Sequence, residues 1–174
     1  MKHPIACALA LAIATALTGQ AAAAEAKEAT MTTNAYSGPF AAPSTLDLNY
    51  PRFDHIQDSD FAPAFDAGMA LELQEFEAIA NNPAPATFQN TIVAMEKAGQ
   101  VLGRATSVFY NLVGTDKNAA REKLESDYAP KFSAHRDAIA LNPKLFARIK
   151  ALHDARATLG LDAVDLRLLE KRHT

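Results

Sequence analysis

A proline-rich interruption between two long apolar patterns constrains the fold more than any other feature of this sequence. The interruption spans Asn81 to Ala86 and contains Pro83 and Pro85. Proline cannot continue a helix, because it lacks the amide hydrogen and its ring crowds the preceding turn. Apolar residues recur at steps of three and four on both sides, which is the helical period. The sequence therefore predicts two helices joined by a turn at Asn81–Ala86, forming a helical hairpin.

The first helix is predicted over Phe61–Ala80. Asp58 or Ser59 is expected to cap its start, and Pro63 is tolerated because it falls in the first turn, where amides have no intrahelical partner. The apolar stripe of this helix consists of Phe61, Phe65, Met69, Leu73, Phe76 and Ala80.

The second helix is predicted as one continuous element that begins after Thr87, its expected N-cap, and ends at Gly114. Gly99 and Gly103 each lower helix propensity by about 1 kcal/mol, so we expect a neighbouring helix to approach closely there. The apolar positions of this helix are Phe88, Ile92, Met95, Leu102, Phe109 and Val113. Of these, Ile92, Met95, Leu102 and Phe109 are expected to be among the most buried residues.

Three further helices complete the prediction. A third begins at Thr115 or Asp116, carries Leu124, Tyr128, Phe132 and Ile139 on one face, and is kinked or split at Pro130. A fourth begins with Asn142 as its cap and Pro143 in its first turn, and runs to Gly160; a fifth opens at Asp162. No segment has a strand pattern. The sequence thus predicts an all-α fold, a helical bundle, over 46–174.

The first 24 residues have the three-part layout of a secretory signal peptide. A short polar start precedes an apolar run from Ile5 to Leu17, and small residues follow, so cleavage is expected after Ala23 or Ala24. A membrane anchor is the alternative, although the apolar run is short for a bilayer. Residues 25–45 are predicted to be a flexible lead-in. Cys7, the only cysteine, would leave with the signal peptide, so the predicted periplasmic protein has no disulfide.

The charge balance argues against two classes of partner. Lysine and arginine number 17 against 20 aspartate and glutamate residues, which gives a net charge of −3. No basic run or face favours nucleic acid, and no polybasic segment favours an anionic membrane surface once the signal peptide is removed.

The five histidines do not form a recognisable metal motif. No two stand four apart on a predicted helix, so the helical histidine pair of a zinc peptidase is missing. His135 lies near Asp137, and His153 lies near Asp154, in different predicted helices. These four residues could form a two-helix metal site, but solvated or capping histidines are favoured.

No nucleophile or acid–base pair is evident either. Ser107 and Ser133 fall in predicted helices, without the glycine-flanked turn that exposes a catalytic serine. Glu72, Glu75 and Glu77 are interpreted as a solvated helix face. From the residues alone, no catalytic, cofactor-binding or metal-binding residue is assigned in this chain.

Several segments, taken in order, resemble a known family. They include FAPAF at Phe61–Phe65, PATFQNTI at Pro85–Ile92, FYNL at Phe109–Leu112, and APKFSAHRDAIALNPKLFARIKAL at Ala129–Leu152. Together they are similar to the N-terminal part of the M3 family of zinc metallopeptidases, closest to the bacterial peptidyl-dipeptidase Dcp and oligopeptidase A branch. The resemblance covers Leu46 to Arg172.

The resemblance implies a function for a longer parent. Family members are helical peptidases with a deep channel, and zinc is held by an HExxH helix and a later glutamate. The peptidyl-dipeptidase type releases C-terminal dipeptides from short peptides. None of these catalytic residues has a counterpart here, so the chain is expected to be an N-terminal fragment, inactive alone, that forms a channel wall. A stand-alone periplasmic helical module that binds peptides or a partner, without catalysis, is the alternative.

Overall fold

The computed structural model of the chain describes residues 36–174, and within them the fold is all-α with no strand. The predicted signal peptide at 1–24 lies outside the described residues. The α-helices are α1 (Phe61–Ala80), α2 (Ala94–Lys97), α3 (Gln100–Thr115), α4 (Ala119–Ala140), α5 (Pro143–Ala155) and α6 (Ala163–His173). Short 3₁₀ turns occupy Asp47–Asn49, Phe53–His55, Asp58–Asp60 and Arg156–Thr158, and a π-helical turn, η4, occupies Gln89–Val93. In the part of the chain described, none of the helices is long and apolar enough to cross a bilayer.

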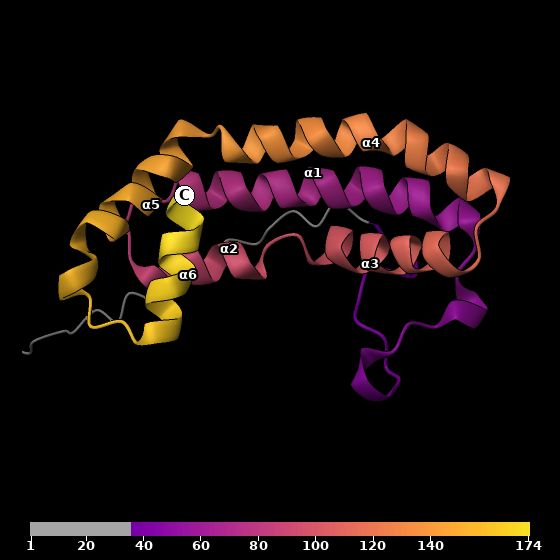
Figure 1. Cartoon of the computed structure of the whole chain (residues 1–174), viewed down its shortest axis with the longest axis horizontal. Helices are drawn as coiled ribbons and strands as arrows, with labels where there is room; N and C mark the ends of the chain where they lie inside the picture. The colour runs from indigo at the N-terminus through magenta and orange to yellow at the C-terminus, as the bar shows by residue number, and fades with distance from the viewer. Residues whose placement is uncertain (1–35) are drawn as a thin grey trace, which may run out of the picture. The chain divides into compact units, whose positions relative to one another are not determined.

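The predicted hairpin is present. Helix α1 ends at Ala80, the chain turns through Asn81–Ala86, and Figure 1 shows α2 and α3 returning along α1. Helix α4 packs against both α1 and α3. Thr87 caps the return as predicted: its hydroxyl accepts the Asn90 amide hydrogen at 3.1 Å, and its own amide donates to Asn90 Oδ1 at 2.8 Å.

The predicted cap of α1 is wrong. Asp58 and Ser59 belong to a 3₁₀ turn that leads directly into the helix, and the N-cap position is Asp60, whose side chain makes no bond to the first turn. Asp58 instead bonds to the distant Arg121, its Oδ1 accepting from Nε at 2.7 Å. That contact joins the start of α1 to the start of α4.

The prediction of one continuous second helix is also wrong. Helix α2 ends at Lys97, Ala98 is extended, and Gly99 takes a left-handed conformation with φ +72° before α3 begins. A non-glycine residue would be strained at this φ. The Gly99 amide donates to Glu75 Oε2 at 2.7 Å, so α1 holds the break from the side.

Close helix approach occurs at a glycine other than the two expected. A Cβ on Gly68 of α1 would lie 2.9 Å from the Leu102 backbone of α3, so the missing side chain lets these helices touch. Gly103, by contrast, has open space around it, and Gly99 faces the Glu72 carboxylate instead of a helix backbone.

The later helices differ from prediction mainly at their ends. Helix α3 runs through Gly114 to Thr115, and α4 begins after Asn118, whose Oδ1 accepts from the Arg121 amide at 2.8 Å. Helix α4 is not split at Pro130, because this residue is exposed and water can reach the carbonyl that loses its partner. Asn142 and Asp162 cap α5 and α6 as predicted, although α5 ends at Ala155 and not at Gly160.

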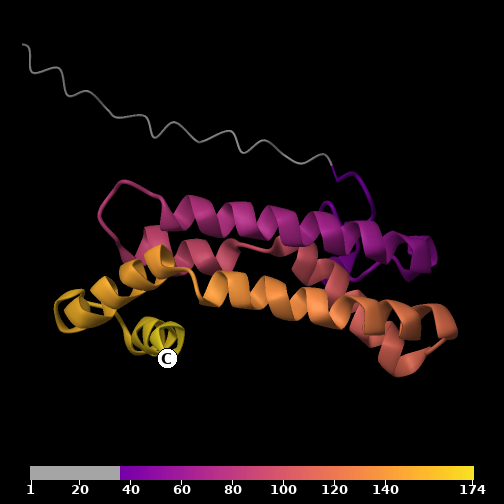
Figure 2. The ribbon, with the colours of Figure 1, turned by 90° about the horizontal axis from the view of Figure 1, so that it is seen from above.

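Two apolar clusters stabilise the fold, and helix α1 contributes to both. The aromatic cluster consists of Phe40, Phe61, Ala64, Phe65, Leu102, Ala105, Val108, Phe109, Tyr128 and Phe132. The aliphatic cluster consists of Phe76, Ile79, Ala80, Ile92, Met95, Leu145, Ile149, Leu152 and Leu169. The predicted burial of Ile92, Met95, Leu102 and Phe109 is confirmed. Figure 2 shows α5 and α6 near the end of α1 that precedes the turn, where the aliphatic cluster lies.

The segment before α1 is packed. Phe40 is 3% exposed and stacks on Phe61, with ring centroids 5.5 Å apart. The expectation of an unpacked lead-in is therefore wrong for 36–45, the part of 25–45 that the structure describes. This contact leaves little trace in the sequence, since one aromatic residue among Ala, Ser and Pro has no periodicity to detect.

Candidate functional site

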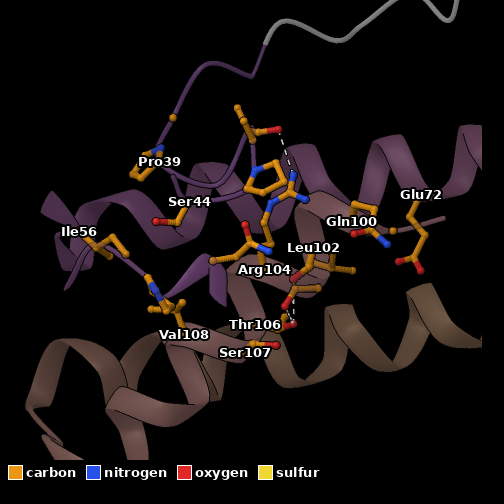
Figure 3. Close-up of a pocket in the computed structure, with 18 of the residues that line it drawn as sticks. Pro39, Ser44, Ile56, Glu72, Gln100, Leu102, Arg104, Thr106, Ser107 and Val108 are labelled. Carbon is orange, nitrogen blue, oxygen red and sulfur yellow. Dashed lines mark hydrogen bonds between the residues drawn. The ribbon is translucent and has the colours of Figure 1, made fainter. Parts of the chain in front are cut away.

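A large open cleft lies beside α3. Its volume is about 1250 Å³, and its walls come from the 37–45 segment, the loop that follows it, α3 and the second half of α4. Figure 3 shows Pro39 and Ser44 on the segment at one side of the cleft, with Gln100, Arg104 and Ser107 on α3. This volume exceeds the roughly 300–1,000 Å³ of drug-sized ligand sites, so the cleft has room for a larger ligand and is the candidate site of the described chain.

The face that α3 turns to the cleft is exposed and mostly polar. Gln100, Gly103, Ser107 and Tyr110 follow one another at steps of three, four and three, so they form one stripe on the helix. We call these four residues the α3 stripe. All four are exposed and line the cleft. Their opposite neighbours, such as Ala105 and Phe109, are fully buried, so the two faces of α3 have separate roles.

Arg104 fastens the 37–45 segment to α3. Its Nε donates to the Phe40 carbonyl at 2.9 Å, and its Nη2 donates to the Ala41 carbonyl at 3.0 Å. Partial burial lowers the pKa of this guanidinium from its usual value. Neutral carbonyls, not a carboxylate, satisfy its hydrogen bonds, so the positive charge is not neutralised by an ion pair within the described residues.

A buried polar pair lies at one end of the cleft. His135 of α4 is 7% exposed, and its Nε2 lies 2.7 Å from Glu72 Oε2 on α1. Because a carboxylate is an acceptor, we assign the shared hydrogen to Nε2. The other ring nitrogen, Nδ1, is buried with no hydrogen-bond partner among residues 36–174.

Two of the three glutamates interpreted as a solvated face are therefore structural. Glu72 is paired with His135, and Glu75 accepts the Gly99 amide hydrogen. Only Glu77 is exposed as predicted. The solvated-face interpretation failed because both partners are distant in sequence, 63 residues from Glu72 and 24 from Glu75, and a local pattern carries no signal for such contacts.

The structure does not bring the candidate metal residues together. His135 is paired with Glu72, while His153 stacks on His173, with parallel rings and centroids 3.9 Å apart. Within residues 36–174, no group of three or more His, Cys, Asp or Glu side chains could hold a metal ion. The zinc that the family resemblance implies therefore has no fitting ligand set in the described residues.

The two serines considered as nucleophiles lie apart. Ser107 belongs to the α3 stripe and is exposed to the cleft, whereas Ser133 is exposed on α4 and does not line the cleft. His135, the histidine of the cleft wall, bonds to Glu72 and not to Ser107. The arrangement fits ligand contact better than nucleophilic chemistry.

Comparison with known proteins relates the chain to a class of peptidases. It is 39% identical over 137 residues to a dipeptidyl carboxypeptidase of Salmonella typhimurium, and 39% identical over 135 residues to one of Escherichia coli. These alignments include 79% and 78% of this chain but only 20% of each relative. The chain thus spans about one fifth of the length of the curated relatives it matches. No family profile matches the chain.

These similarities confirm the resemblance to peptidyl-dipeptidases in its coarse form. The assignment to the zinc-dependent M3 family, and the place of the segment within a longer enzyme, stay predictions. The cleft could not be predicted from the sequence, because it depends on the 37–45 segment, which Arg104 fixes across more than 60 residues of chain.

Proposed function

We propose that this chain is the N-terminal helical part of a peptidyl-dipeptidase, in which it forms a wall of the substrate channel. The observation that carries the proposal is the 39% identity to two dipeptidyl carboxypeptidases over most of the chain. The parent would release C-terminal dipeptides from short peptides, and this segment would limit which peptides enter.

The arrangement of the cleft is consistent with a wall. The α3 stripe presents exposed polar groups, while the reverse face of α3 packs in the aromatic cluster. A rigid helix with one solvent-facing side can contact a passing peptide without changing its own packing. Such contacts select substrate by size and shape, and they need no catalytic group in this chain.

The zinc chemistry is proposed for the parent and not for the described residues. Zinc hydrolases hold the metal with about three protein ligands and leave one position for water. Since His135 is paired with Glu72 and His153 stacks on His173, no catalytic step is assigned to these residues. We further propose export to the periplasm, with removal of residues 1–24; N-terminal sequencing of the periplasmic protein tests this, and a retained Met1 would contradict it.

A chimera tests the proposed function. The chain replaces the segment of the E. coli dipeptidyl carboxypeptidase to which it aligns, and release of a dipeptide from an N-blocked short peptide is measured with and without a metal chelator. We expect chelator-sensitive release by the chimera and none by the 174-residue chain alone. The E. coli protein lacking the segment is the control.

Two outcomes would overturn the proposal. A chimera that is folded and monodisperse but does not release dipeptides would show that the segment cannot serve in such an enzyme. Chelator-sensitive release by the 174-residue chain alone would show that the chain carries its own catalytic site, and the wall role would be wrong.

A further inference from the structure

We propose that the cleft beside α3 is a binding groove for an extended, acidic peptide segment. The proposal rests on the proposed function in one respect, because it assumes that the longer parent enzyme binds peptides. It names the class of peptide that the wall prefers. Three features of the cleft carry it: the open floor at Gly103, the polar groups of the α3 stripe that bond to no other described residue, and the positive charge of the walls.

The floor of the cleft admits a close backbone approach. Gly103 lies in the middle of the α3 stripe, and a Cβ placed on it would meet no atom within 4 Å. Glycine here is not required by the fold, because its backbone is helical and no neighbour packs on it. Because residue 103 has no side chain, a ligand backbone can touch the helix between Gln100 and Ser107.

The polar side chains of the stripe are available to a ligand. Those of Gln100, Ser107 and Tyr110 make no hydrogen bond to another described residue, whereas Thr106, one position away, bonds back to the Leu102 carbonyl at 2.8 Å. An extended peptide presents amide and carbonyl groups along its length. Gln and Ser can bond to both kinds of group, and Tyr adds an aromatic surface.

The charge of the walls selects an acidic ligand. Arg104 and Arg136 both line the cleft, and neither forms an ion pair within residues 36–174. Arg52 is offset by Asp54, and Glu72, the acidic residue of the lining, is outnumbered by Arg104 and Arg136. The unbalanced charge is therefore positive, in a chain whose net charge is −3. Carboxylates of a ligand would supply the missing partners.

The first test measures binding of a fluorescent acidic hexapeptide to the 174-residue chain by anisotropy. The matched peptides carry Gln or Lys at the three Glu positions. Gly103→Leu fills the floor, and Gly114→Leu is its control, because Gly114 also lies in α3 with open space around it but outside the cleft. We expect Gly103→Leu to weaken binding about tenfold and Gly114→Leu to leave it unchanged, with circular dichroism the same for both.

The second test removes charge. Arg136→Gln is expected to weaken binding of the acidic peptide about threefold, and added salt should reduce the difference between acidic and Gln peptides. Arg167→Gln is the control, because Arg167 is an exposed arginine of α6 that does not line the cleft.

Several outcomes would overturn the groove. They are no binding of the acidic peptide, equal binding of the acidic and Lys peptides, equal loss in Gly103→Leu and Gly114→Leu, or tighter binding of a single-stranded oligonucleotide of the same charge. Each can occur while the chimera releases dipeptides, so failure of the groove is distinguishable from failure of the proposed function. Selective binding that is lost in Gly103→Leu supports the groove whether or not the chimera is active.

Discussion

The aromatic and aliphatic clusters are held together in different ways. In the aromatic cluster, six rings lie with neighbouring centroids 5.0–5.9 Å apart, and they come from the long helices α1, α3 and α4 and the 37–45 segment. The aliphatic cluster has one aromatic residue among its buried members, Phe76, and it joins the end of α1 and η4 to the shorter α2, α5 and α6. Polar clamps surround it: Arg148 bonds to the hairpin turn, and Arg172 bonds to Glu96 at 2.6 Å.

The difference shows how two parts of one small fold can reach stability by separate routes. Offset and edge-to-face rings contribute beyond the area they bury, and in the aromatic cluster they act beside polar links such as Asp58–Arg121. Short helices bury less surface each and rely on caps and side-chain clamps to fix their ends. We therefore expect substitutions of the same kind to have unequal effects in the two clusters.

The largest effect is expected at Phe65. Its ring is fully buried and lies within 5.0–5.9 Å of Phe61, Phe109, Tyr128 and Phe132. Phe65→Ala should lower the free energy of unfolding by about 3–5 kcal/mol, measured by urea denaturation. Phe76→Ala, the same substitution in the aliphatic cluster, is the reference and should cost less, because it removes no ring–ring contact among the described residues. A loss at Phe65 as small as the reference would remove the distinction between the clusters.

Two glycine substitutions test the packing of α1 against α3 at the aromatic cluster. Gly68→Ala places a Cβ 2.9 Å from the Leu102 backbone, so it should destabilise the fold by about 2 kcal/mol through overpacking. Gly103→Ala meets nothing and should stabilise it by up to about 1 kcal/mol through helix propensity. The melting temperature of each variant is measured by thermal unfolding. Shifts of the same sign in the two variants would contradict the close approach of α1 and α3.

Removal of the Arg148 side chain, which bonds to the hairpin turn, should act mainly on the aliphatic cluster. Its Nη1 donates to the Asn82 and Ala84 carbonyls at 2.9 and 3.0 Å, and its Nη2 donates to Asn90 Oδ1 at 2.9 Å. Arg148→Met should cost about 1–2 kcal/mol and raise hydrogen exchange in the turn and η4. Arg148→Lys keeps the charge but not the forked geometry, so it should behave like Met; full rescue by Lys would mean that charge alone matters.

The smallest effect is expected from pH at the contact of α5 and α6. Desolvation, and then the neighbouring His173, lowers the pKa of His153 below its usual value. A folded-state pKa below the unfolded one means that the contribution is present above about pH 6.5 and is lost as pH falls through the folded value. The protection of α6 amides against hydrogen exchange, relative to an unfolded chain, should therefore fall as pH drops below about 6.5, and His153→Gln should remove most of this fall. Equal losses of protection in both proteins would place the effect elsewhere.

Local signals in the sequence predicted the helices and several of their ends. Thr87, Asn142 and Asp162 cap the helices that they were expected to cap, because a capping side chain acts on amides only two or three residues away. The all-α fold and the turn at Asn81–Ala86 follow from periodicity and proline in the same way.

Contacts between distant residues were not predictable from one sequence. The apolar period continues across Gly99, so the break between α2 and α3 is invisible until Glu75 is placed beside it. The pairing of Glu72 with His135, and the anchoring of 37–45 by Arg104, also depend on tertiary packing. Every element of the candidate site that was missed belongs to this second class.

The break at Gly99 separates the helical phase of η4 and α2 from that of α3. In an uninterrupted helix, one inserted residue turns every later side chain by about 100°, which would rotate Leu102 and Phe109 out of the aromatic cluster. Because Ala98 is extended and Gly99 is left-handed, a length change in η4 or α2 does not rotate the side chains of α3. Such a change would alter the faces that η4 and α2 present to the aliphatic cluster. Length variation in descendants of this chain should therefore accumulate before Gly99 and be rare within α3.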